Sequence, residues 1–414
     1  MGKLLEKFYY IFLSIVPLSI IIGPATSLIN IVILSIIYLY FFFKFNHLNL
    51  LKKNNTIKIF LILYLYLIIN SFISLNFETS AHRNFGFMRF ILFFLAINYL
   101  FYINEKNIKI FNFWTIILSL FIFDVYFERI NGTNILGWGG NYGNRIVSFF
   151  KDEPIAASFI NGFIFILSAQ MLSFFEKKKF GKIIFLIFLS IIFISVLITG
   201  ERSNTIKAVF GLILFISLIN VYDFKTKIIF FIALPTIMIF TIFNSDYLKN
   251  RYYGQIISKI YKEKNINTFN DNIYIKLYRS GFSVFKNYPL TGVGNKNYRI
   301  ETCGNAEVVK KNKYYCLTHP HQIYFELLSE HGLIGTIVIL YTFFVLIFKN
   351  LRVIINSQNY LQIGAFTFLI CNFLPFIPSG SFFSDFNISL FILNLSILYA
   401  VNKKTNIFFK ENLK

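Results

Sequence analysis

Long apolar segments recur along almost the whole chain, and this feature restricts the possible fold more than any other. Each segment has roughly 18 or more apolar residues, enough for one helix to cross about 30 Å of hydrocarbon. With 56% hydrophobic and only 14% charged residues, the 414-residue chain has too little polar surface for a water-soluble globule. The pattern predicts an all-α integral membrane protein with about 12 transmembrane helices. We place these spans at residues 8–25, 28–43, 57–74, 87–103, 108–126, 155–174, 183–199, 205–221, 226–243, 331–348, 359–376 and 382–401.

Basic residues are distributed as a membrane topology requires. If the N-terminus is cytoplasmic, every connection on the inside carries Lys or Arg, in agreement with the positive-inside rule. Topology then explains most of the net charge of +21, and no nucleic-acid partner is expected. The first span has no small-residue cleavage site after it, so we expect a retained helix and not a removed signal peptide.

Three regions follow from this topology. Residues 1–243 hold spans one to nine with an outside loop at about 127–154, residues 244–330 form a large outside loop with short helices, and residues 331–414 hold the last three spans and an inside tail. The large loop is basic although it lies outside. Such a surface attracts anionic lipid head groups or phosphate-bearing ligands.

Two arginines are candidates for binding an anion. Arg202 lies at the boundary between the seventh and eighth spans, where an arginine is costly unless it is paired or meets a ligand. The alternative for Arg202 is an ion pair with Glu201. Arg279 lies in an apparent amphipathic surface helix at about 275–285, where contact with lipid head groups is the alternative. Together, two guanidinium groups would suit a diphosphate.

His319 and His321 flank Pro320 just before the tenth predicted span. Alternation along an extended segment predicts that the two rings point to opposite sides, so that only one of them faces a given pocket. A neutral imidazole there can accept a proton from an attacking hydroxyl group. Structural hydrogen bonding and metal ligation remain as alternatives, although a metal site would need a third ligand.

Weaker signals complete the candidate site. Gly292-Val293-Gly294 is either a phosphate-binding turn or, more simply, a tight structural turn. In the same outside loop, Cys303 and Cys316 form a disulfide or remain free, depending on whether the compartment is oxidising. The absence of an Asp-x-Asp pair argues against a metal-dependent sugar transferase. The lesser site candidates are Arg299, Glu326, Asp152 and Glu153.

The segments that hold these candidates resemble a known family. The relevant residues are Arg279, the run from Tyr288 to Gly294, His319-Pro320-His321-Gln322, Glu326, and the run from Glu330 to Gly335. Supporting matches are 199–203, 150–157 and 375–383. These segments resemble the shared core of the bacterial O-antigen ligase and O-antigen polymerase superfamily. Gln322 stands where the family pattern usually has Asn.

This resemblance implies a GT-C-like glycosyltransferase of the bacterial inner membrane that acts at the periplasmic face without a metal or another cofactor. The implied donor is a glycan on undecaprenyl diphosphate, and the implied acceptor is lipid A-core or a lipid-linked glycan. On this model Arg202 and Arg279 hold the diphosphate. His321, with His319 second, deprotonates the acceptor hydroxyl group, and membrane lipids surround the spans.

The resemblance leaves several functions open. An O-antigen ligase and a polysaccharide polymerase would share every residue named above, and a protein O-oligosaccharyltransferase would differ only in its acceptor. A transporter of lipid-linked sugars belongs to another class. Transporters favour inverted repeats and polar residues at mid-membrane, and the sequence shows neither.

Overall fold

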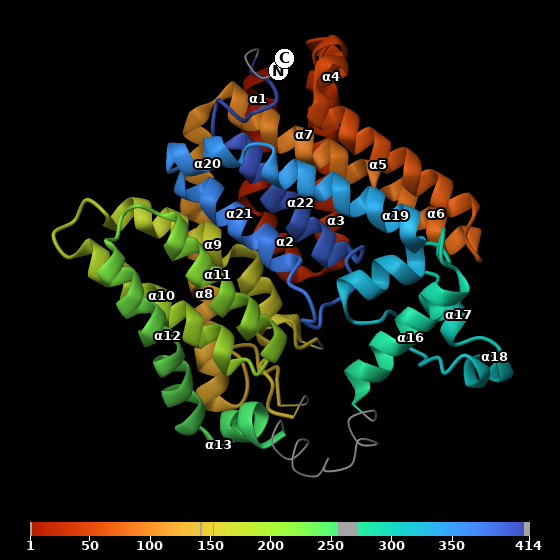
Figure 1. Ribbon diagram of the computed structural model, residues 1–414. Coiled ribbons are helices and arrows are strands. Elements are labelled where there is room, and N and C mark those ends of the chain that lie inside the picture. The colour runs from red at the N-terminus through yellow and green to blue at the C-terminus, as the bar shows by residue number, and fades with distance from the viewer. Residues whose placement is uncertain (1, 141–142, 152, 256–271, 410–414) are drawn as a thin grey trace.

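The computed structural model describes residues 2–140, 143–151, 153–255 and 272–409, and these residues form helices joined by loops, without a β-strand (Figure 1). The N-terminal helices are α1 (Gly2–Ser14), α2 (Val16–Ile22), α3 (Pro24–Lys44), α4 (Leu48–Lys53), α5 (Asn55–Phe72), α6 (Phe77–Gly86), α7 (Met88–Ile103), the 3₁₀ helix η1 (Glu105–Lys109) and α8 (Ile110–Asn131). The central helices are the 3₁₀ helix η2 (Ser148–Phe150), α9 (Ala156–Phe175), α10 (Gly181–Ile198), α11 (Arg202–Leu218), α12 (Phe224–Phe243), α13 (Asp246–Leu248) and the π-helical turn η3 (Lys249–Gly254). The C-terminal helices are α16 (Ile273–Asn287), α17 (Tyr298–Thr302), α18 (Ala306–Lys311), α19 (Ile323–Phe348), α20 (Leu351–Ser357), α21 (Tyr360–Asn372) and α22 (Asp385–Ala400).

Eight helices in the described part of the chain are long and apolar enough to cross a membrane, or nine if α1 and α2, which meet at a bend of 52°, form one span. Each of the twelve predicted spans coincides with a helix or with this bent pair. Four of these helices have fewer than 18 residues. The helix α7 has 16 but continues from α6, whereas α11 has 17, α21 has 13 and α22 has 16. The chain is thus a multi-pass membrane protein, and the count of twelve stays a prediction.

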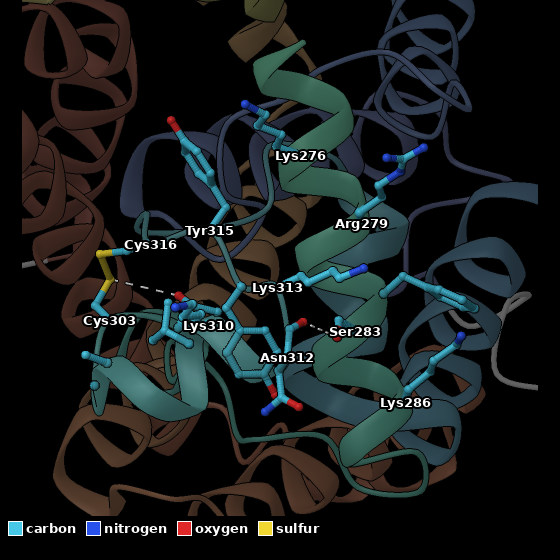
Figure 2. A pocket seen from close by; sticks show the side chains of 16 residues that line it. Lys276, Arg279, Ser283, Lys286, Cys303, Lys310, Asn312, Lys313, Tyr315 and Cys316 are labelled. Carbon is cyan, nitrogen blue, oxygen red and sulfur yellow. Dashed lines mark hydrogen bonds between the residues drawn. A yellow bond between two sulfur atoms is a disulfide. The ribbon is translucent and has the colours of Figure 1, made fainter. Parts of the chain in front are cut away.

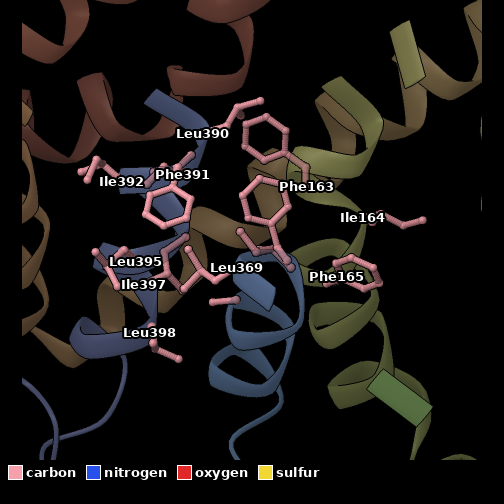
Figure 3. Close-up of a cluster of buried hydrophobic side chains, with 14 of the residues drawn as sticks. Phe163, Ile164, Phe165, Leu369, Leu390, Phe391, Ile392, Leu395, Ile397 and Leu398 are labelled. Carbon is pink, nitrogen blue, oxygen red and sulfur yellow. The ribbon is translucent and has the colours of Figure 1, made fainter. Parts of the chain in front are cut away.

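The core of the molecule is the packing of α22 against α7, α9 and α21. Every residue of α22 from Ile388 to Ala400 is buried. Figure 3 shows Leu390 and Phe391 of α22 beside Leu369 of α21 and Phe163 of α9. A helix enclosed by protein on all sides needs no lipid-facing surface, which explains how α22 can be as short as about 24 Å.

The outward faces of the peripheral helices are apolar. Phe43 of α3 is 75% exposed, and Phe240 and Ile229 of α12 are 71% and 66% exposed. Large apolar patches on a protein surface normally mark contact with another apolar phase. Here the hydrocarbon of a membrane provides that phase.

A glycine-rich crossing joins the segment 289–294 to the helix α19. The helix α19 is broken at Gly332, which has φ 61° and ψ −167°. The segment 289–294 fits into this break, because the amide groups of Val293 and Gly294 donate to the carbonyl groups of Ser329 and Glu330 at 3.0 and 2.8 Å. These amides are therefore occupied, and the Gly-x-Gly sequence is a structural turn. The predicted region boundary at 330/331 lies inside α19, one residue before its break.

Candidate functional site

A cavity of about 960 Å³ opens where α9, α11, α21 and α22 meet the segments that connect the helices. Its wall is rich in titratable side chains, and basic groups outnumber acidic ones. The titratable residues that line it are Arg83, Arg145, Glu153, Glu201, Lys207, Tyr274, Lys296, Arg299, His319, His321, Cys371 and Asp385. We call it the histidine cavity.

Both histidines line this cavity, and their ring centroids are 3.9 Å apart. The prediction that they point to opposite sides is therefore wrong. The reason is the backbone of His321, whose φ of 56° is left-handed and interrupts the alternation of an extended segment. The amide of Ser379 donates to the carbonyl oxygen of His321 at 2.9 Å and stabilises this conformation.

The histidine rings are held in a neutral state. Burial, followed by the positive charge of Lys296, lowers the pKa of His319 to about 4. Burial, followed by the neighbouring His319, lowers the pKa of His321 to about 4. His319 Nδ1 lies 2.9 Å from Thr318 Oγ1, and its Nε2 is buried without a hydrogen-bond partner among the described residues. A buried ring nitrogen without a partner is suited to bind a substrate group.

A polar network supports the wall behind the histidines. The Lys296 ammonium group donates to Ser381 Oγ, and Ser381 Oγ in turn donates to Glu326 Oε1 at 2.5 Å. The Phe382 amide also donates to both Glu326 oxygens, at 3.1 and 3.0 Å. Glu326 is fully buried and does not line the cavity, and its hydrogen bonds hold Ser381 and Phe382 in place.

A second carboxylate, Glu201, lines the cavity itself. It accepts hydrogen bonds from the Ala157 amide at 2.8 Å and from Asn204 Nδ2 at 2.7 Å. Burial raises the pKa of Glu201 to about 7, although these bonds and the charge of Arg145 act in the opposite direction. Arg145 donates to the Pro154 carbonyl at 3.2 Å, and its Nε is buried without a partner among the described residues.

The structure brings together some of the predicted site residues and separates others. Glu153 and Arg299 line the histidine cavity, whereas Asp152 lies outside the described residues. Arg202 is the first residue of α11, within electrostatic range of Arg145 and Arg251, but it is not among the lining residues.

Arg279 lies elsewhere. It lines a separate cavity of about 780 Å³ beside a disulfide that joins Cys303 and Cys316 (Figure 2). The expected convergence of Arg202 and Arg279 on one cavity is therefore not seen. The amphipathic helix predicted for residues 275–285 is confirmed as α16.

Four cationic residues of the histidine cavity were not predicted from the sequence: Arg83, Arg145, Lys207 and Lys296. One signal could have pointed to Arg145. Arginine is rare in this lysine-rich chain, and three of its arginines, Arg83, Arg145 and Arg299, line this cavity. Nothing in the sequence separates Lys296 from the other basic residues of its loop. Among the described residues, no group of three His, Cys, Asp or Glu side chains is arranged to hold a metal ion.

Residues 185–340 match the family model of the O-antigen ligase. This match confirms that the chain resembles the O-antigen ligase and polymerase superfamily over that segment. The matched segment runs from α10 to the middle of α19 and contains Glu201, Lys296 and both cavity histidines. Arg145 and Asp385 lie outside it, so the cavity combines the O-antigen ligase segment with flanking parts of the chain. No curated protein matches the chain at a significant level.

Gln322 occupies the position where the family pattern usually has Asn. Its side-chain oxygen accepts a hydrogen bond from the Phe325 amide at 3.0 Å, and it thereby caps the N-terminus of α19. This bond holds the residue after His321 in place on the first turn of the helix.

Proposed function

We propose that the protein is a glycosyltransferase that moves a glycan from undecaprenyl diphosphate to a hydroxyl group of lipid A-core, at the periplasmic face of a bacterial inner membrane. The observation that carries the proposal is the pair of neutral histidines on the wall of a cavity rich in cations. The family match supports the same reaction class.

In the proposed reaction, the acceptor oxygen attacks the anomeric carbon and the bond between this carbon and the diphosphate oxygen breaks. His321 accepts the proton of the acceptor hydroxyl group, and His319 lies beside it. The leaving diphosphate gains negative charge. Arg145, Lys296 and Arg299 line the cavity where this charge would develop, and cations that are already in place stabilise it without reorganising.

Arg202 and Arg279 enter the proposal from the family resemblance. The position of Arg202 near Arg145 supports a contribution to donor binding. Arg279 lines the other cavity, so its position gives no such support. Its variant is therefore the sharper test of the predicted donor site.

The test is glycan transfer by the purified protein in nanodiscs, with an undecaprenyl-diphosphate oligosaccharide and with or without lipid A-core. We expect His321→Ala to lower kcat by about 10²–10⁴-fold, as loss of a general base does. His82→Ala is the matched control, because His82 is exposed on α6 and does not line the cavity. Undiminished transfer by the His321 variant would remove it as the base.

The donor site is tested in the same assay. Arg299→Ala should raise the KM for the donor or lower kcat, whereas Arg352→Ala, an exposed arginine of α20, should do neither. Arg279→Ala is measured beside them.

A ladder of longer diphosphate-linked glycans formed without lipid A-core would establish a polymerase in place of a ligase. Protein acceptors test the O-oligosaccharyltransferase, and absence of transfer under every condition would favour a transporter.

A further inference from the structure

The second cavity is a separate feature of the outside loop. It lies between α16 and the facing segment 302–316, and it shares no lining residue with the histidine cavity. Figure 2 shows Lys276, Arg279 and Lys286 on α16, with Lys310 and Lys313 on the facing segment. Among the described residues that line it, none is Asp or Glu. We call it the lysine cavity.

The walls of the lysine cavity are fixed by covalent and polar contacts. The disulfide between Cys303 and Cys316 ties the two ends of the facing segment. Ser283 of α16 donates to the Asn312 carbonyl at 2.8 Å (Figure 2), and Asn287 Nδ2 donates to Tyr314 Oη at 2.6 Å. A binding site held in its final shape loses less entropy when a ligand binds.

Four cations of this cavity lack an acidic partner among the described residues. In the described part of the chain, no ion pair involves Arg279, Lys286, Lys310 or Lys313. Like charges around one concave surface repel each other and raise the local concentration of anions. An anionic ligand would offset this repulsion.

The remaining lining residues indicate what else the ligand contains. Phe282 on α16 and Tyr314 and Tyr315 on the facing segment contribute aromatic surface to the lining. A volume of about 780 Å³ lies within the range of small-molecule sites and exceeds the need of a free phosphate ion. Aromatic faces, hydroxyl groups and cations together suit a sugar that carries negative charge.

We propose that the lysine cavity binds an anionic saccharide, one that bears phosphate or carboxylate groups. Its position supports a role beside the reaction. Gly281 of α16 packs against Pro320, where an added Cβ would lie 3.0 Å from the proline side chain, so one helix separates the lysine cavity from the histidine pair. The role of this saccharide as the acceptor of the reaction rests on the proposed function. The binding of the saccharide does not.

The experiment measures binding to the full-length protein in nanodiscs of zwitterionic lipid, without any donor. The probe is a glucosamine disaccharide with two phosphates, compared with the same disaccharide without phosphates. We expect binding of the phosphorylated form only, and we expect this binding to weaken as salt is added. Lys310→Gln with Lys313→Gln should weaken it by about tenfold or more.

The matched control is Lys311→Gln with Lys249→Gln, which removes the same charge from exposed lysines outside the cavity. It should bind the probe like the unmodified protein. Equal binding of both disaccharides, equal loss in both double variants, or no binding at all would overturn the proposal. Displacement of the probe by nanodiscs that contain anionic lipid would also overturn it, because the site would then hold lipid head groups.

A transfer assay separates this inference from the proposed function. If the saccharide is the acceptor, the Lys310 and Lys313 double variant should raise the acceptor KM and leave the donor KM unchanged. Probe binding that depends on these lysines, in a protein without transferase activity, would refute the proposed function and retain the site.

Discussion

At the scale of single residues, a histidine acts as a base only while it is neutral. The pKa of His321 is lowered to about 4, first by burial and then by His319, so the neutral form is complete above roughly pH 5 and is lost as the pH falls through 4. We therefore expect the kcat/KM for transfer not to fall as the pH is lowered from about 8 to 5. A pH–rate profile checks this.

A separate group could mask that result. The pKa of the buried Glu201 carboxyl is raised to about 7, so its titration could add a step near neutral pH. The profile should therefore also be measured for Glu201→Gln. An acid limb between pH 6 and 7 that persists in this variant would contradict the prediction for the histidines.

The sequence could predict the histidines but not their arrangement. Residue type and the position before an apolar segment identified His319 and His321, whereas the left-handed backbone of His321 depends on a hydrogen bond from Ser379, far along the chain. The position of Lys296 in the site could not be predicted from the sequence either. Its contact with Ser381 joins two segments that the sequence gives no reason to pair.

At the scale of elements, the crossing between the segment 289–294 and α19 depends on two glycines. An added Cβ at Gly332 would lie 2.4 Å from the backbone of Leu290, and one at Gly292 would lie 2.4 Å from the backbone of Glu330. Both residues also have positive φ. Backbone atoms cannot move aside as a flexible side chain can, so these positions accept only glycine.

We expect Gly332→Ala to lower the free energy of unfolding by at least about 3 kcal/mol, because overlap adds to backbone strain. Gly137→Ala is the control, since Gly137 has φ 78° but open space around its Cβ position. It should cost only about 1–2 kcal/mol, the strain of a left-handed alanine. Thermal unfolding of both variants in detergent measures the difference. An equal fall in Tm would show that the crossing is not tightly packed.

Element prediction succeeded where hydropathy alone decides. Every predicted span coincides with a helix or, for the first span, with the bent pair α1 and α2, because about 18 consecutive apolar residues have few other stable structures in lipid. It was less accurate where a polar helix continues an apolar one. The helix α8 extends to Asn131 and α19 begins at Ile323, because caps and outside contacts decide these ends and hydropathy does not.

At the scale of the whole molecule, charge distribution predicts which end of the bundle faces the cytoplasm. In Figure 1, α1, α4 and α20 lie at one end, and α13, α16 and α18 lie at the other. The helix α4 ends in lysines, and lysines follow the end of α9. The positive-inside rule assigns these lysines to the cytoplasm. The disulfide between Cys303 and Cys316 lies at the other end of the bundle, with α16 and α18. A disulfide there suits an oxidising compartment outside the cytoplasm.

Single introduced cysteines test this orientation in intact cells with a maleimide that cannot cross the membrane. The native background should be low, because two cysteines form the disulfide and Cys371 is buried. We expect Glu307→Cys in α18 to be labelled from outside, and Lys178→Cys, between α9 and α10, to be labelled only after permeabilisation. Labelling of position 178 in intact cells would invert the topology. The histidine cavity would then face the cytoplasm, away from a periplasmic acceptor, and the proposed transfer reaction would fail with it.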